Sequence, residues 1–259
     1  MRFLSLASSS HGNAYLVDDG KTVLLLECGL SFRRLGQLVR GAGYQLSGLS
    51  GCLISHEHGD HARCWEKLAG RGVPLYASDG TIAALGAEGI IKPLAPEVGQ
   101  DVSAPVRIGS FSVLSFRTFH DAEEPVGFLI RSTVDGEKLA FATDTGNIRY
   151  QFPGLSLLAI EANYQEEILA RCTRIPEATV KRIRYTHMEI GRLCGYLSGL
   201  DLRGCRELYL LHLSDASSDE AWFAQCVRRV VPETCRVMVC EKGGRIRGEE
   251  GEKQLHSVL

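Results

Sequence analysis

The sequence predicts an α/β protein in which two β-sheets pack face to face with helices on the outside. Three observations support this fold class: short apolar runs alternate with helical patterns, the alternation occurs in two successive halves, and no low-complexity linker separates the halves. The chain has 259 residues, of which 44% are hydrophobic, so it can build a sizeable core. We therefore expect a single domain over residues 1–259.

The expected elements follow the chain in order. Period-2 and continuous apolar runs predict strands in the first half at 2–7, 13–17, 22–27 and 52–55, and helical spacing predicts helices at 31–43 and 61–70. In the second half, strands are expected at 111–119, 126–132, 138–143, 155–162, 207–213 and 235–241, with a mostly helical stretch at about 163–200 and a helix at 218–231. The charged, glycine-rich tail from about residue 242 is expected to be frayed or loosely docked.

Composition excludes several classes of protein. A formal net charge of -2, with 23% charged residues, shows no global bias toward nucleic acid. The N-terminus has no signal-peptide core and no apolar run approaches membrane-spanning length, so we expect a cytoplasmic protein without a membrane partner. Nine cysteines without a CxxC pair argue against a disulfide framework or a cysteine-based zinc site, and we expect reduced, mostly buried thiols.

The segment HEHGDH at residues 56–61 carries four potential metal ligands directly after a predicted buried strand. In a tight loop eased by Gly59, His56 and His58 can face one point while Asp60 and His61 face another. Imidazole and carboxylate are ligands that Zn²⁺, Mn²⁺ and Fe²⁺ accept. Four such groups in six residues therefore predict a two-metal site, rather than a polar surface loop.

Three more candidate ligands stand where a predicted strand gives way to a loop. They are His120, Asp144 and His212. Taken singly, each has an ordinary structural explanation as a loop, turn-forming or capping residue. Together with the first cluster they give seven candidate ligands in the order HxHxDH, H, D, H.

This order resembles that of the metallo-β-lactamase superfamily, and three further segments resemble the WalJ/YycJ-like group within it. They are ASSSHGNAYLV at 7–17, LLLECGLS at 24–31 and FHDAEEPVGF at 119–128, which are similar to the group's A-S-x-S-x-G-N, D-x-G and H-D-A-x-x-P-x-G-F motifs. The resemblance implies a four-layer αββα sandwich, the metallo-β-lactamase fold. It also implies 5′-to-3′ exonuclease action on DNA.

The resemblance further implies how the ligands are shared. His56, His58 and His120 would hold the first metal, Asp60, His61 and His212 the second, and Asp144 would bridge the two. Two segments depart from the group's pattern: Glu27 stands where Asp is usual, and THMEI at 186–190 keeps His187 in place of a G-H-L-S segment. In EANYQ, Tyr164 stands where the family has a histidine.

A two-metal site activates water as the nucleophile, so no Ser or Cys attack is needed. Asp60 is expected to orient that water or take its proton, and His187 to contact a phosphate or protonate the leaving oxygen. The segment 170–192 carries six basic residues, Arg182 and Arg184 among them, against two acidic ones, a formal +4 that suits a phosphate backbone; the alternative is a solvated helical face. Further candidate substrate contacts are Ser10, Asn13 and Asn163, and a structural hydrogen bond is the alternative for each.

The favoured function is a metal-dependent phosphodiesterase that acts as a DNA exonuclease with two divalent ions, Zn or Mn, with Fe as an alternative. A rival hydrolase of small molecules, such as a cyclic phosphodiester, a lactone or a thioester, would use the same metals. An iron-binding redox protein and a metal-stabilised binding module are further alternatives. The sequence leaves the physiological metal and the oligomeric state open.

Overall fold

The computed structural model describes residues 1–94, 96 and 100–240, and the chain divides into two compact units. Unit 1 comprises Met1–Arg117 and Ala122–Glu137, and unit 2 comprises Thr118–Asp121 and Lys138–Cys240. The expected single domain stays a prediction. The tail expected from about residue 242 lies outside the described residues.

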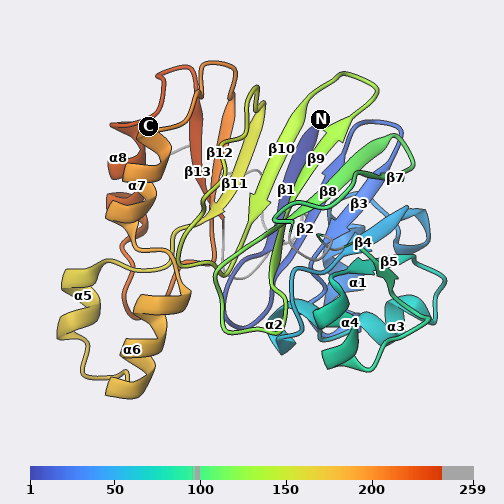
Figure 1. The fold of residues 1–259 in the computed structure, drawn as a ribbon, viewed down its shortest axis with the longest axis horizontal. Helices are drawn as coiled ribbons and strands as arrows, with labels where there is room; N and C mark the ends of the chain where they lie inside the picture. Colours follow the sequence, from blue (N-terminus) through green and yellow to red (C-terminus); the bar gives the residue numbers. More distant parts are fainter. Residues whose placement is uncertain (95, 97–99, 241–259) are drawn as a thin grey trace. The chain divides into compact units, whose positions relative to one another are not determined.

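Unit 1 contains a six-stranded sheet whose strands lie side by side in sequence order (Figure 1). The first three strands are antiparallel, and each later strand pairs in parallel with the one before it. The strands are β1 (Arg2–Ala7), β2 (Ala14–Asp18), β3 (Val23–Leu26), β4 (Gly51–Leu53), β5 (Leu75–Ala77) and β6 (Lys92–Pro93). Because β3 and β4 are parallel, their carboxyl ends meet at one edge, where Glu27 and the HEHGDH loop follow.

The helices of unit 1 connect these parallel strands. They are α1 (Phe32–Gly41), the 3₁₀ turn η1 (Leu46–Gly48), α2 (Gly59–Ala62), α3 (Trp65–Ala69) and α4 (Asp79–Leu85). The side chain of Ser31 caps α1 by accepting a hydrogen bond from the backbone N of Arg34 at 3.3 Å. Leu35, Leu38 and Val39 of α1 are buried in the core cluster that also contains side chains of β3 and β4. Helical spacing of these apolar residues thus fixes which face of α1 covers the sheet.

Unit 1 also contains an antiparallel set of three strands, β7 (Val106–Ile108), β8 (Phe111–Arg117) and β9 (Val126–Ser132). This set packs on the six-stranded sheet, because a Cβ added at Gly51 of β4 would lie 3.3 Å from Cγ2 of Ile108. The buried carboxylate of Asp19, in the turn after β2, also links the six-stranded sheet to this three-stranded set. Its Oδ2 accepts hydrogen bonds from Oγ of Ser110 at 2.7 Å and Oγ of Ser132 at 2.8 Å.

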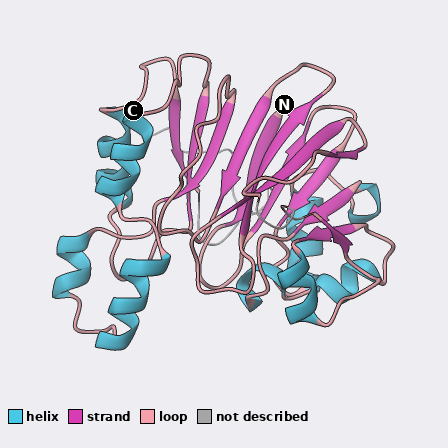
Figure 2. Ribbon diagram, viewed as in Figure 1, coloured by secondary structure: helices cyan, strands magenta, loops and turns pink. Residues whose placement is uncertain are grey.

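Unit 2 is built on four parallel strands, β10 (Lys138–Ala142), β11 (Leu157–Glu161), β12 (Glu207–Leu211) and β13 (Arg236–Val239). Every residue of β11 and β12 is buried, as expected of central parallel strands. The helices are α5 (Glu166–Arg171), α6 (Glu177–Thr186), α7 (Ile190–Ser198) and α8 (Glu220–Arg228). Helix α8 contacts β13, and α7 contacts α8 (Figure 2).

Most expected elements are present, with some differences in their bounds. The helix expected at 61–70 is two short helices, because the backbone N of Cys64 donates to the carbonyl of Cys28 at 3.1 Å and leaves the helical pattern between them. Strand β5 and helix α4 were not predicted, since three residues of strand and seven of helix give too short a periodic pattern. Among the described residues no helix is long and apolar enough to cross a membrane.

Replacing Asp19 with Asn is expected to lower the free energy of unfolding by roughly 2 kcal/mol at pH 7, because an amide has only one accepting oxygen. In Asp19 both carboxylate oxygens accept: Oδ2 from the two serine hydroxyls, and Oδ1 from the backbone N of Lys21 and Thr22. Burial raises the pKa of Asp19, but hydrogen bonds from Ser110, Thr22, Ser132 and Lys21 outweigh it and hold the pKa below its usual value. The stabilisation is therefore present above the unfolded-state pKa of about 4 and is lost as the pH falls through the folded-state value. Urea unfolding should show the difference between wild type and Asp19→Asn shrinking below pH 4; a constant difference would contradict this assignment.

Candidate metal centre

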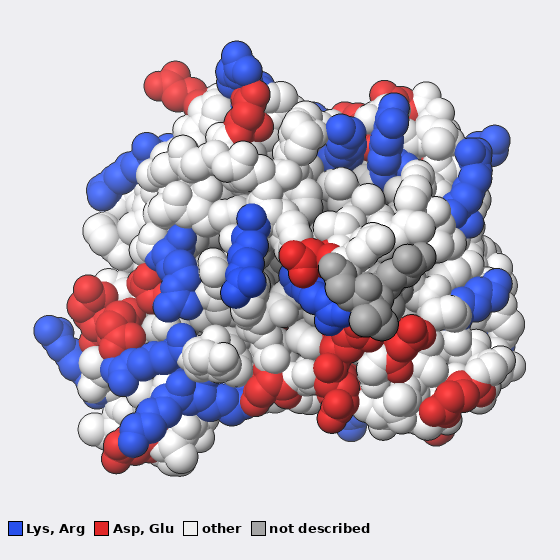
Figure 3. All heavy atoms as spheres, in the orientation of Figure 1, with Lys and Arg blue, Asp and Glu red and all other residues white. Residues whose placement is uncertain are grey.

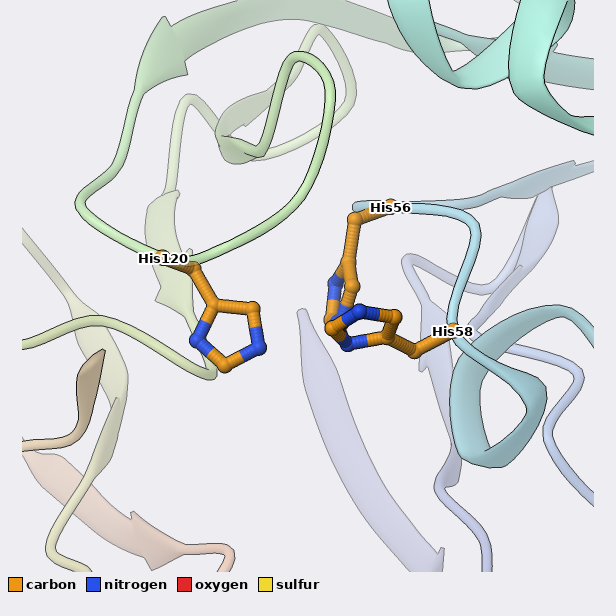
Figure 4. Close-up of side chains that lie close together, drawn as sticks. All are labelled: His56, His58 and His120. Atoms are coloured by element: carbon orange, nitrogen blue, oxygen red, sulfur yellow. Dashed lines mark hydrogen bonds between the residues drawn. The ribbon is translucent and has the colours of Figure 1, made fainter. Parts of the chain in front are cut away.

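The loop between β4 and α2 in unit 1 carries four predicted ligands. Nε2 of His56 lies 3.1 Å from Nδ1 of His58, and Nε2 of His61 lies 3.3 Å from Oδ2 of Asp60. Figure 4 shows the rings of His56 and His58 turned toward each other; His120, drawn in the same view, belongs to unit 2. His56 and His61 are buried, whereas His58 and Asp60 are half-buried. The loop therefore groups imidazole and carboxylate donors as two adjacent pairs.

A fully buried carboxylate supports this loop. Oε2 of Glu27 lies 3.3 Å from Nδ1 of His61, and Oε1 accepts a hydrogen bond from the backbone N of Ser55 at 3.2 Å. Oγ of Ser55 lies 2.9 Å from Nδ1 of His56. Burial raises the pKa of Glu27, and its contacts with His61 and Ser55 oppose that rise. Glu27 therefore orients ligands of both pairs, a supporting role that a longer side chain than Asp fills here.

The chain approaches the ligand loop closely at Gly29 and Asn13. The backbone N of Cys28 donates to the carbonyl of His61 at 2.7 Å, and a Cβ added at Gly29 would lie 1.6 Å from the carbonyl oxygen of Asp60. The side chain of Asn13 donates to that same carbonyl at 3.2 Å and lies 3.1 Å from Nε2 of His61. The contacts of the Cys28–Gly29 backbone and of the Asn13 side chain together fix the path of the loop through Asp60 and His61.

Unit 2 carries the other three predicted ligands: Asp144 and His212 follow β10 and β12, and His120 lies in the short segment Thr118–Asp121. Nδ1 of His212 lies 3.0 Å from Oδ1 of Asp144, and Nε2 of His120 lies 3.5 Å from Oδ2 of Asp144. Nδ1 of His120 lies 3.0 Å from the carbonyl oxygen of Thr186. Asp144 and His212 have positive φ angles of 45° and 53°, a conformation that non-glycine residues adopt at an energetic cost. The backbone at both strand ends is thus held in an unusual conformation where the ligands stand.

Glu161, at the end of β11, connects this second set, and sequence reasoning missed it as a site residue. Its Oε1 lies 2.7 Å from Nδ1 of His187 and 3.1 Å from Nδ1 of His212, and its Oε2 accepts from the backbone N of Thr145 at 2.7 Å. Burial raises the pKa of Glu161, but the interaction with His187 leads the effects that lower it overall. The available signal was a Glu at the end of the apolar run LSLLAIEA, because such a residue is rarely buried without partners.

Comparison with known proteins decides the family. Residues 22–213 match the family model described as the beta-lactamase superfamily domain. The chain belongs to the metallo-β-lactamase superfamily. This superfamily member is 30% identical over 226 residues to "Exodeoxyribonuclease YycJ" of Bacillus anthracis, with 83% of each protein covered.

A second curated relative and one solved structure are also similar to the chain, and the structure bears on the fold alone. It is 31% identical over 179 residues to "Exodeoxyribonuclease WalJ" of Streptococcus pneumoniae strain D39, covering 65% of this chain and 64% of that one. The solved structure of the metallo-β-lactamase fold protein YhfI from Bacillus subtilis matches 93% of this chain and 96% of its own, with a TM-score of 0.66 and 18% identity. The predicted WalJ/YycJ-like group and fold class are confirmed, and the chain is a metal-dependent hydrolase.

The donors of both ligand sets fit divalent metal ions. Both ligand sets offer imidazole nitrogens and carboxylate oxygens, without a thiolate. Ligand atoms of Asp144, Glu161, His187 and His212 lie within 4.8 Å of one another in unit 2. Burial lowers the pKa of His120 and so favours the neutral imidazole that a metal requires. The identity of the metal does not follow from these donors, because Zn²⁺, Mn²⁺ and Fe²⁺ all accept them.

The predicted substrate contacts take different places. Asn13 contacts the ligand loop, and Ser10 is exposed in the turn that precedes Asn13. The side chain of Asn163 donates to the carbonyl of His212 at 2.8 Å, so that it supports a ligand residue. Arg182 pairs with Asp121 at 2.5 Å, and Arg184 pairs with Glu166. Their roles as substrate contacts stay predictions.

We expect Gly29→Ala to destabilise the protein by about 3 kcal/mol and to lower its metal content, because the added Cβ overlaps the carbonyl of Asp60. Gly59→Ala is the matched control: it lies within the ligand loop itself, but its Cβ meets nothing within 4 Å. Thermal unfolding and metal analysis of both variants test this expectation. Equal behaviour of the two would show that the close approach at Gly29 is dispensable.

Glu161→Gln is expected to weaken metal binding about 10- to 100-fold, because the carboxylate no longer fixes His187 and His212. Glu207→Gln provides the control, since Glu207 is a buried glutamate at the opposite end of neighbouring strand β12. Titration calorimetry with Mn²⁺ and Zn²⁺ measures the affinity, and thermal unfolding measures stability in parallel. A similar loss of affinity in Glu207→Gln would argue against a specific supporting role for Glu161.

Proposed function

We propose that this hydrolase cleaves phosphodiester bonds in DNA and removes nucleotides from the 5′ end. The observation that carries the proposal is the 30% identity, over 83% of both proteins, to a relative named an exodeoxyribonuclease. The basic segment 170–192 supports it, because Arg and Lys attract a phosphate backbone.

In this proposal the seven predicted residues hold two divalent ions. His56, His58 and His120 would hold one ion, Asp60, His61 and His212 would hold the other, and Asp144 would contribute to both. When bound, two such ions would supply Lewis-acid chemistry: they would lower the pKa of a bound water toward 7 and stabilise the negative charge that develops on the attacked phosphate. We propose Mn²⁺ or Zn²⁺ in this role, with Fe²⁺ as the alternative.

The side chains of the protein then position the reactants. Asp60 orients the attacking water and takes its proton through a carboxylate oxygen. Glu161 engages Nδ1 of His187, so that Nε2 is the nitrogen of this ring that contacts a phosphate oxygen or protonates the leaving oxygen. Asn163 holds the backbone of His212 and thereby keeps a ligand in place.

The test is digestion of duplex and single-stranded DNA that carries a 5′-phosphate or a 5′-hydroxyl and a label at either end. With Mn²⁺ or Zn²⁺, wild type is expected to release short products from the 5′ end, and Asp60→Ala to lower the rate more than about 100-fold. Asp79→Ala is the matched control, because Asp79 is likewise an acidic residue in the first turn of a short helix of unit 1.

Equal rates for wild type and Asp60→Ala would refute the proposed site. Hydrolysis of bis(p-nitrophenyl) phosphate without any loss of DNA would keep the metal centre and assign it a small phosphodiester substrate instead. Visible absorption from bound iron without hydrolysis of either compound would favour redox chemistry.

A further inference from the structure

Helices α5 and α6 with their connection, residues 166–186, form a segment that we call the arm. Of all the residues in its two helices, only Leu169 and Thr186 are buried. Figure 1 shows both helices projecting beyond the strands of unit 2. Most helices in globular proteins are stabilised by packing an apolar face against a core, and the arm lacks such a face. Its exposed side chains are therefore available for a partner.

The arginines of the arm fall into two groups. Arg182 forms an ion pair with Asp121, and Arg184 forms one with Glu166. The positive charge of each of these arginines is therefore largely balanced by its acidic partner. Arg171 and Arg174 are exposed and form no ion pair within the described part of the chain. Both line a hollow of about 490 Å³ that is formed by α5, the connection after it and Ala216, with Gln165, Glu167 and Thr173 also in its lining. Figure 3 shows basic side chains gathered over α5 and α6, interleaved with acidic ones.

Tyr185, in the last turn of α6, is 81% exposed. It is the most exposed large apolar side chain among the described residues, and Trp222, another exposed aromatic residue, has the guanidinium of Arg229 over its ring. The ring of Tyr185 is therefore available to stack against a partner, since an aromatic side chain offers a flat apolar face.

The position of Tyr185 is fixed by the second ligand set. A Cβ added at Gly146, two residues after Asp144, would lie 2.3 Å from the carbonyl oxygen of Tyr185. The carbonyl of the next residue, Thr186, lies 3.0 Å from Nδ1 of His120. The exposed ring of Tyr185 therefore belongs to a stretch of backbone that contacts His120, a predicted metal ligand of the same unit.

We infer that the arm binds single-stranded nucleic acid, with an unpaired base stacked on Tyr185 and phosphates of the same strand at Arg171 and Arg174. This inference rests on the proposed nuclease function and adds strand selectivity to it. An aromatic platform together with unpaired cations is the usual composition of single-strand binding surfaces. A base inside a duplex has no free face to stack, so the platform selects an unpaired end.

The dimensions of the arm suit this arrangement. Eight residues of α6, 177–184, separate Tyr185 from the connection that holds Arg174, which corresponds to about 12 Å of helix. A stacked strand advances about 3.4 Å per nucleotide, so this length covers roughly four nucleotides. The base nearest the ligand residues would therefore stack while the following backbone crosses the two arginines.

The first test measures binding without hydrolysis, by fluorescence anisotropy of a labelled 12-nucleotide single strand and of the blunt duplex of the same sequence in EDTA. Tyr185→Ala is expected to weaken single-strand binding about tenfold, because base–aromatic stacking is lost. Tyr185→Phe retains the ring and is expected to stay within twofold of wild type. Duplex binding should be the same for all three proteins, and far-UV circular dichroism checks that each is folded.

The second test measures the contribution of the arginines through salt dependence. Arg171→Gln and Arg174→Gln should each reduce the slope of log affinity against log salt by about 0.7 for the single strand. Arg203→Gln is the control, since Arg203 is an exposed arginine of unit 2 that pairs with Asp201 outside the arm. The same RNA sequence, run in parallel, shows whether the arm distinguishes the sugar.

The outcomes separate this inference from the proposed function. If wild type fails to bind the single strand, or if Tyr185→Ala binds it as tightly as Tyr185→Phe, the inference is wrong, whatever the enzyme hydrolyses. If the alanine variant loses single-strand binding but wild type hydrolyses no DNA with any metal, the arm binds nucleic acid and the nuclease proposal fails. Loss of both single-strand affinity and digestion of single-stranded DNA in the alanine variant alone supports both.

Discussion

Each ligand set depends on one fully buried glutamate. Glu27 in unit 1 contacts His61 and the backbone of Ser55, and Glu161 in unit 2 contacts His187 and His212. A carboxylate without solvent is costly unless donors surround it, and both residues are surrounded by N–H groups of imidazole rings and of the backbone. Because the glutamates engage specific ring nitrogens, they also fix the orientation of the histidines. The interactions that offset the cost of burying these carboxylates therefore also orient the histidine nitrogens that could bind a metal.

Several of the site residues at the ends of parallel strands have an energetically costly backbone conformation. Glu27, Asp144 and His212 are the three non-glycine residues described with positive φ, and they follow β3, β10 and β12. Each such conformation costs of the order of 1–3 kcal/mol, and it persists because the surrounding structure fixes it. At Glu27, for example, the backbone N donates to the carbonyl of Leu53 at 2.9 Å. The strain turns each side chain away from its strand and toward the other groups of its set.

The arm differs from the two ligand sets in burial and in ion pairing. The supporting glutamates are buried and fully engaged, whereas the arm exposes an aromatic ring and two arginines without ion pairs. Formal charge alone would have assigned phosphate contacts to Arg182 and Arg184. The structure gives these two acidic partners and leaves Arg171 and Arg174 to contribute the local positive charge, because proximity to Asp121 and Glu166 is decided by folding.

The sequence by itself determined the family, the alternation of strands and helices, and the seven candidate ligands, because HEHGDH and three residues at strand ends form a local and distinctive pattern. Family and fold are confirmed by the comparisons, and the ligand assignment stays a proposal. Tertiary structure decided what sequence spacing does not encode. Glu161 lies 26 residues from His187 and 51 from His212, yet it contacts both rings. Parallel β11 and β12 bring Glu161 and His212 to one edge, and the C-terminal end of α6 brings His187 there. The exposure of Tyr185 was likewise hidden, because an aromatic residue in a helical pattern is ordinarily a core residue, and only the packing around α6 leaves it in solvent.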